Sequence, residues 1–394
     1  MRRQIPVFFA LAFSASAAFS QSVKITDYST PISKAEQFWF NFDFNRSSFD
    51  GSSTTDGFAA LNYNRFYDSL PFSWAIRADV EAQYLDDDLR HNRNIFATFR
   101  KYFSNSNKSF AFGSAFNNSD VINGREFQAE VHNTFFTVGL GFGRVINATA
   151  LAKAIRIDEF LNKDQKLNGA LSASHLNELA HLIERRNQYE TTYGETYEVQ
   201  WFQDMEAVLQ NAGRLPDSEL DAWGILRMRE VLTFERIFQR MHGWTLEVGL
   251  SGQFDHENDT ESVGLDARLR IDLPIGLKSQ FSHFSSYREP LDDDFSNRRF
   301  FTSSSFTREI TNRVDLALNH SFNYNRNDFT NFFRNDFFTT KSTRLSAEFF
   351  YYLENRFTLT ISGNVFGQNL TRLDERDDWR WGTTFIAALG YRIR

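Results

Sequence analysis

Long stretches of the chain alternate between apolar and polar residues with a period of two. From Phe38 to Phe44 every second residue is phenylalanine, and from Val263 to Ile271 every second residue is aliphatic. Because successive side chains of a β-strand point to opposite faces, this pattern predicts strands with one apolar face and one polar face. We expect fourteen such strands, near 36–46, 57–67, 72–84, 93–103, 109–117, 127–145, 243–255, 262–273, 276–288, 298–309, 313–325, 337–353, 355–368 and 379–393.

The connections between these segments are alternately short and long. Short connections follow the even-numbered segments, at 68–71, 104–108, 274–275, 311–312 and 354–355. Longer ones follow the odd-numbered segments, at 47–56, 85–92, 118–126, 289–297, 326–336 and 369–378; the connection near Asn258 fits this pattern least. Segments of about 10 residues with short turns at one end and long loops at the other are typical of membrane barrels. The sequence therefore predicts an all-β, transmembrane, antiparallel barrel of about 14 strands, not a soluble two-sheet sandwich.

One connection departs from this rule. Between residues 147 and 242 the apolar period changes to about 3.6 residues, as in Leu176, Leu179, Ala180 and Ile183. We predict an inserted α-helical module of about four helices, near 148–162, 172–187, 190–212 and 217–241. Since the insert follows the sixth strand, the side of the short turns is its expected place, which is the periplasmic side of such barrels. Insertion into the lumen as a plug is the alternative.

The N-terminus predicts export. Arg2 and Arg3 precede an apolar stretch that ends in small residues near Ala18, which is the pattern of a secretory signal peptide over residues 1–20. We divide the rest into a periplasmic N-terminal segment (21–35), barrel strands 1–6 (36–146), the helical insert (147–242) and barrel strands 7–14 (243–394).

Composition narrows the function classes. The net charge of −7 argues against a nucleic-acid partner. The absence of cysteine excludes disulfides and thiolate metal sites. Forty-four phenylalanines and only 6 prolines suit long hydrogen-bonded ladders. Mean hydropathy is −0.45, which a barrel tolerates because only alternate residues meet lipid.

Signal peptide, alternating strands, alternating loop lengths and an aromatic last strand together make the chain similar to Gram-negative outer-membrane β-barrel proteins. The resemblance covers most of the mature chain and implies a place in the cell outer membrane. It also implies contact with outer-membrane lipids, and with the barrel-assembly machinery during biogenesis. Many such proteins end on an aromatic residue, whereas here Arg394 follows Tyr391 and Ile393.

Charged residues recur on the predicted inward face. In a water-filled lumen, a mixed ring of charges would give weak ion selectivity, as in a porin-like channel for small solutes. The alternative is that these charges pair across strands and fill the interior. The predicted lumen-lining residues are Arg77, Asp79, Glu81, Glu247, Asp266, Arg268, Arg270, Lys278, Arg344, Glu348 and Arg356. We expect no catalytic residue, no cofactor and no metal, so the favoured function is transport and not enzymatic.

Two other functions stay open. In the first, the barrel is a non-transporting anchor or assembly scaffold, and residues 147–242 bind a periplasmic protein partner. In the second, the protein is a lipid-modifying outer-membrane enzyme. His283 and Ser285 share one face of a strand, and outer-membrane lipid hydrolases have a similar pair facing the lipid. Because no third group that would orient the histidine can be identified, we interpret the pair as incidental.

The remaining polar motifs have plainer interpretations. Three acidic clusters on predicted outer loops resemble no calcium-loop motif and are expected to be solvated; they are 86–88, 292–294 and the acidic residues of 374–378. His175 and His181 do not share a helical face and match no metal pattern. The glycines at 139, 141 and 143 are not a nucleotide fingerprint, and fit a kink or close packing at a barrel rim.

Overall fold

The computed structural model describes residues 23–49, 52–85, 88–103, 108–123, 128–216, 219–234, 237–255, 260–291, 295–311, 313–331, 334–353, 357–372 and 378–391. The predicted signal peptide and Arg356 lie outside these residues. So do most residues of the three acidic clusters.

The prediction of fourteen antiparallel strands is confirmed. They form one sheet in which each strand pairs with its neighbour in the chain. The strands are β1 (Ser33–Phe49), β2 (Ser52–Asp68), β3 (Phe72–Leu85), β4 (Asp88–Tyr102), β5 (Ser109–Asn123), β6 (Gln128–Asn147), β7 (Met241–Asp255), β8 (Thr260–Ile275), β9 (Ser279–Pro290), β10 (Phe295–Thr311), β11 (Val314–Asn331), β12 (Arg334–Leu353), β13 (Phe357–Arg372) and β14 (Trp379–Tyr391).

The two faces of the sheet differ sharply in polarity, and the apolar face is the exposed one. On β7, Leu246, Val248 and Leu250 are 44%, 45% and 50% exposed. Glu247 lies between them on the other face and is only 8% exposed. Asp272 on β8 is fully buried. This is the reverse of a water-soluble sheet, in which the apolar face is buried.

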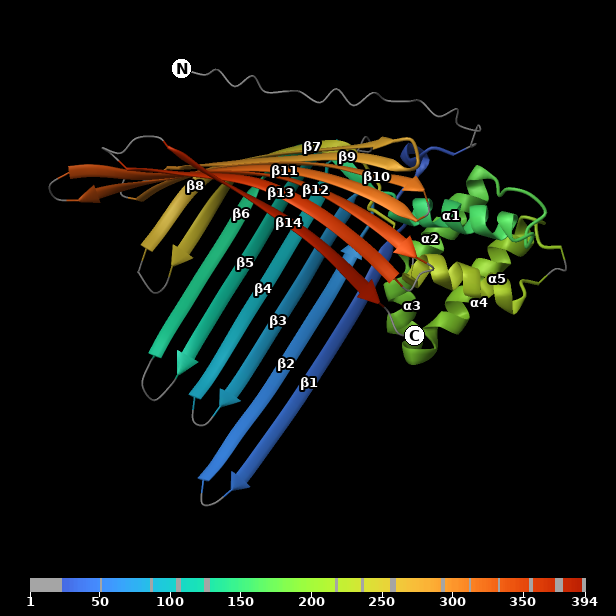
Figure 1. The fold of residues 1–394 in the computed structure, drawn as a ribbon, viewed down its shortest axis with the longest axis horizontal. Coiled ribbons are helices and arrows are strands. Elements are labelled where there is room, and N and C mark those ends of the chain that lie inside the picture. Colours follow the sequence, from blue (N-terminus) through green and yellow to red (C-terminus); the bar gives the residue numbers. More distant parts are fainter. Residues whose placement is uncertain are drawn as a thin grey trace.

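The expectation of a closed barrel is not met in this structure. The sheet is open, since its strand order runs from β1 to β14 with no pairing between these two edge strands in the described residues. Figure 1 shows a strongly curved trough. Alternation along a strand fixes the face that each side chain takes. It does not fix the tilt and stagger that bring the first and last strands together, so the sequence pattern alone could not decide closure.

A helical module interrupts the sheet between β6 and β7, as predicted. Its helices are α1 (Thr149–Lys163), α2 (Ala173–Glu184), α3 (Arg186–Tyr193), α4 (Tyr197–Asn211) and α5 (Ala222–Arg229), followed by a π-helical turn over Glu230–Phe234. The predicted helix over 190–212 is divided in two, because Gly194 adopts a positive φ of +59° at the end of α3. The predicted last helix, 217–241, is shorter than expected, because α5 begins at Ala222 and the π-helical turn that follows it ends at Phe234.

The module has its own apolar core, which includes Leu151, Leu179, Met205 and Val231. The segment before β1 joins this core through Val23, Ile25 and Tyr28. Leu277, in the connection from β8 to β9, packs against it from the sheet. The module lies at the end of the sheet where β1 begins and β14 ends (Figure 1).

A buried ion triad joins the module to the sheet. Glu309 of β10 accepts from Arg156 of α1 and from Arg240, which precedes β7; both N–O distances are 2.5 Å. The three side chains are 6%, 8% and 0% exposed. Arg240 also donates to the backbone carbonyl of Leu277 at 3.0 Å. Glu309 therefore fixes where the module attaches.

In the described part of the chain, no helix is both long enough and apolar enough to cross a membrane.

We predict that Glu309→Gln loosens the module. The substitution removes the carboxylate that two buried guanidinium groups share. Arg156 keeps the longer contact of 3.5 Å to Glu159, and the loss should cost about 3 kcal/mol. Thermal unfolding followed through the helical circular-dichroism signal should show a lower midpoint. The control is Lys166→Gln, which removes a partly exposed ion pair to Asp221 and should change the midpoint far less. Equal shifts in the two variants would contradict the anchoring role.

Candidate functional site on the polar face of the sheet

The strand register brings the predicted inward residues onto one face. Side chains of directly opposed residues in an antiparallel pair point to the same side of the sheet. Following the register from strand to strand, nine of the eleven predicted residues share the polar face. They are Arg77, Asp79, Glu81, Glu247, Asp266, Arg268, Arg270, Arg344 and Glu348. Lys278 lies in the connection from β8 to β9. That these residues line a lumen depends on closure, and stays a prediction.

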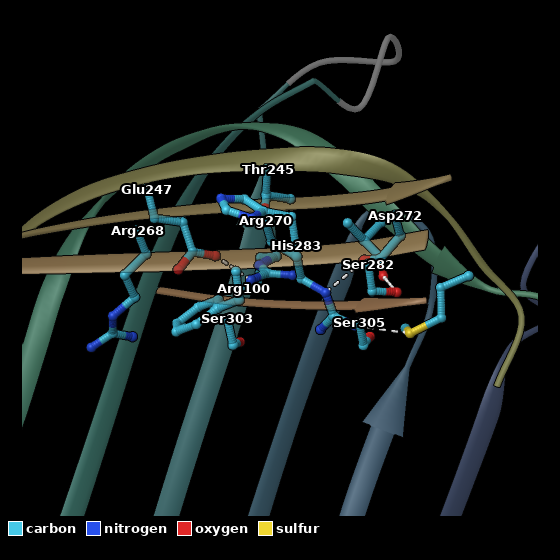
Figure 2. Close-up of a pocket in the computed structure, with 13 residues that line it drawn as sticks. Arg100, Thr245, Glu247, Arg268, Arg270, Asp272, Ser282, His283, Ser303 and Ser305 are labelled. Carbon is cyan, nitrogen blue, oxygen red and sulfur yellow. Dashed lines mark hydrogen bonds and ion pairs between the residues drawn. The ribbon is translucent and has the colours of Figure 1, made fainter. Parts of the chain in front are cut away.

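The polar face contains a hollow of about 450 Å³. Its lining residues come from β4 and from β6 to β10, so strands far apart in the sheet face one another across it. Figure 2 shows that the labelled arginines, carboxylates and serines gather on this side of the curved strands. The hollow is the best-defined candidate site that the described residues form on this face.

Two ion pairs form the wall of the hollow. Arg100 of β4 pairs with Glu247 of β7, although β5 and β6 lie between their strands. Arg270 donates from Nε to Asp272 Oδ2 at 2.7 Å, and the hydroxyl of Ser282 donates to Asp272 Oδ1 at 2.6 Å. Asp272 is completely buried and Glu247 nearly so, which makes these charge-assisted bonds stronger than bonds on an open surface. Neither Arg100 nor Asp272 was among the predicted lumen residues, although both have the alternation that would have selected them.

Gly141 of β6 makes room for the Arg100–Glu247 pair, the one that spans two intervening strands. Gly141 lies directly opposite Glu247, and a Cβ built on Gly141 would lie 2.2 Å from the ring of Phe110. The ring therefore occupies the space above this glycine, and the guanidinium of Arg100 stacks over it at 4.6 Å. Close packing thus accounts for Gly141, which is one of the two explanations that the sequence suggested, whereas Gly143 adopts a positive φ of +93°.

Arg268 differs from its neighbours. It lies directly opposite Glu247 in the register, yet it makes no ion pair with any residue of the described ranges. Its one hydrogen bond there is a long contact of 3.5 Å from Nη2 to the Thr137 hydroxyl. In Figure 2 its side chain extends away from the Glu247 carboxylate. Arg268 is half-buried and lines the hollow, and among the described residues its guanidinium has no ion-pair partner.

The other predicted residues do not line this hollow. Arg77 and Asp79 line a separate recess near β1 and β2. Arg344 lines a recess that adjoins the hollow, since Ser303 and Ser305 line both. Asp266 is buried opposite Arg288. Glu81 is exposed, near the end of β3 remote from the module. The structure therefore gathers Glu247, Arg268 and Arg270, and distributes the rest over the face.

Titratable groups also meet where the module joins the sheet. Burial, followed by repulsion from Asp68, raises the pKa of the Glu184 carboxyl above its ordinary value of 4.5, while Lys153 opposes the shift. Tyr28 is 2% exposed, and burial together with Glu184 raises the pKa of its phenol. Lys153 is itself desolvated, which lowers the pKa of its ammonium group. Burial in the module therefore favours the neutral forms of this carboxyl group and this phenol.

The opposite, apolar face carries the His283–Ser285 pair, now with a third group. His283 Nε2 lies 2.8 Å from Ser285 Oγ, and its Nδ1 lies 2.9 Å from Ser304 Oγ on β10. Ser285 Oγ also donates to Thr302 Oγ1 at 2.9 Å. The sequence could not identify Ser304, because only the register of β9 against β10 places it opposite His283.

The two histidines of the module have structural contacts. His175 accepts or donates a hydrogen bond with the N-cap residue Ser172 at 2.9 Å, and His181 packs edge-on against the ring of Tyr28. Within the part of the chain that the structure describes, no three histidine or acidic side chains gather as metal ligands would.

Comparison with known proteins assigns no family: neither a scan against protein-family models nor a search of the curated proteins gives a match.

We predict that Glu184 makes the module less stable as the pH rises. A carboxyl whose pKa is raised by folding contributes most stability below its ordinary value of 4.5, where it is protonated in both states. That contribution is lost as the pH rises through the raised pKa of the folded state. Glu184→Gln should therefore raise the thermal midpoint of the helical signal at neutral pH and flatten its dependence on pH. Glu178→Gln, on the exposed face of the same helix, is the control; a wild-type slope in Glu184→Gln would exclude this role.

Proposed function

We propose that this protein is an outer-membrane β-barrel that forms a porin-like channel for small solutes. The observation that carries the proposal is the reversed polarity of the sheet: its aliphatic face is exposed, and its charged face lines a recess. In water such a face would be an unfavourable apolar surface, whereas in a bilayer it is the surface that lipid requires.

The apolar face is continuous across the strands that flank the insert. On β6 and β7, Val138, Leu140, Leu246 and Val248 lie on neighbouring strands and are 44% to 64% exposed. On the last strand, Phe385 is 74% exposed. Contiguous exposed apolar surface of this kind marks a membrane or protein contact. Because it extends from the middle of the sheet to its edge, surrounding lipid is the simpler partner.

Closure of β1 against β14 completes the proposal. Each edge strand carries backbone amide and carbonyl groups with no partner strand, and lipid cannot satisfy them. Pairing the two edges would satisfy both at once. Fourteen strands enclose more space than side chains fill, since about eight is the filled case. The recess that Figure 2 shows would then form part of a polar lumen.

The α3 helix lies where this seam would form. Gln37 of β1 donates to Glu190 at 3.1 Å, and the Thr191 hydroxyl donates to the backbone carbonyl of Glu36 at 3.2 Å. These contacts involve only the first residues of β1, so the rest of the edge is free to pair. We place the module on the periplasmic side, by the parity of the connections and by its position at the ends of the strands.

A scaffold role is supported by one feature of the module. Trp223 and Leu226, three residues apart on α5, are 52% and 55% exposed, which suits a surface that binds a periplasmic protein. In this second candidate function the barrel anchors the module and conducts nothing.

Lipid hydrolysis is the third candidate, and the contacts of His283 support it. In this mechanism the Ser285 hydroxyl turns its proton from Thr302 toward His283, which takes it as Ser285 Oγ attacks the ester carbonyl carbon of a phospholipid. His283 then returns the proton to the departing glycerol oxygen. Water, activated by the same histidine, releases the fatty acid and restores Ser285. Ser304 would orient the imidazole, and the exposed apolar face would bring the lipid to it.

We expect stepwise single-channel conductance from the refolded full-length protein in planar bilayers. A version in which residues 147–242 are replaced by a short turn should still conduct, because the polar hollow is built from strands. Larger or steadier steps in that version would show that the module narrows the lumen. Silence from both proteins, with β-rich folding verified by circular dichroism, would reject the channel and favour the scaffold.

We expect the lipid-hydrolysis candidate to depend on one hydroxyl. If it holds, purified protein releases fatty acid from phospholipid vesicles, and Ser285→Ala lowers that release by about 100-fold or more. Ser286→Ala, which changes the adjacent serine on the opposite face, is the matched control. Intact lipids after incubation with the wild-type protein would eliminate this candidate.

A further inference from the structure

We infer that the hollow on the polar face is a binding site for small anions, with Arg268 as its free cation. The ligand class is a small carboxylate or inorganic phosphate. This inference deepens the proposed channel function and rests on it, because it names the solutes that the lumen favours.

The charge balance of the hollow is positive. Three guanidinium groups line it, from Arg100, Arg268 and Arg270, against two carboxylates, from Glu247 and Asp272. The carboxylates are already engaged by Arg100 and Arg270. Among the described residues, Arg268 has one hydrogen bond, the long contact to Thr137. A guanidinium presents a planar set of donors that matches carboxylate and phosphate oxygens, so an anion is the ligand it is suited to bind.

Further donors face the same space. Ser303 and Ser305 of β10 line the hollow, and neither hydroxyl makes a hydrogen bond within the described ranges. Their hydroxyls can each donate one hydrogen bond to an anion held by Arg268. The volume, about 450 Å³, lies in the range of small-molecule sites and far exceeds that of one water.

Positive charge continues along the same face beyond the hollow. On β9, two residue pairs further from the module, Arg288 lies directly opposite Arg299 of β10. Like charges in this position repel, and the buried Asp266 on the other side of Arg288 offsets that repulsion. Arginine side chains therefore continue along this face beyond the hollow.

The test is ion selectivity in planar bilayers. The full-length protein is placed in a potassium chloride gradient, and the reversal potential gives the ratio of chloride to potassium permeability. The wild-type channel should favour chloride. Arg268→Gln should lower that ratio about fivefold, as expected for one unit charge acting at contact distance in water, and Arg268→Glu should favour potassium. Arg229→Gln, which removes an exposed arginine of α5 in the helical module, should leave the ratio close to that of the wild type.

Added inorganic phosphate gives a second readout on the same channels. It should reduce the chloride current along a saturating curve in the wild type and in Arg229→Gln, and much less in Arg268→Gln. A conducting wild-type channel with equal selectivity and equal phosphate block in all variants would overturn the anion site while leaving the channel intact. A folded protein that never conducts would overturn both proposals.

Discussion

The structure depends on one constraint of the extended backbone, which is that successive side chains point to opposite faces while the amide and carbonyl groups bond sideways to the next strand. In this chain the alternating positions are apolar on one side and charged on the other, and hairpin connections keep each strand beside the next. The sheet therefore separates two environments. Its exposed aliphatic side is suited to lipid, and its polar side is suited to water and ions.

The polar side is held by its own ion pairs, and this determines what it can bind. Asp272 and Glu247 are each matched by an arginine, so their charges are neutralised where they lie. Among the described residues, the guanidinium group that lines the hollow without an ion-pair partner is that of Arg268. A face filled only with matched pairs would be an inert packing layer, whereas one with an unmatched arginine beside open volume has a reason to attract anions. The strand register that brings the ion pairs together therefore also determines that Arg268 is the arginine without a paired carboxylate within the described ranges.

The module adds a second structural unit to this sheet. Its core is apolar and includes residues of the segment that precedes β1. It is fixed to the strands by Glu309, whose two arginine partners come from both ends of the insert. This ion triad fixes the position of the module because breaking it would leave buried charges with weaker pairing. The contact of α3 with β1 places the module beside the edge that a barrel would have to close, so module and seam are neighbours.

The sequence by itself determined the strands, their number and their faces, because alternation is a local property of each segment. It also located the helical insert and most charged residues of the polar face, including Arg268 and Arg270. Other features depended on the tertiary structure. The pairing of Arg100 with Glu247 crosses two intervening strands. It also depends on Gly141, whose missing side chain leaves space for the ring of Phe110. Ser304 meets His283 only through the register of one hairpin. The open edge between β1 and β14 follows from the curvature of the whole sheet. Curvature and register are sums over many residues, so no short pattern along the chain contains them.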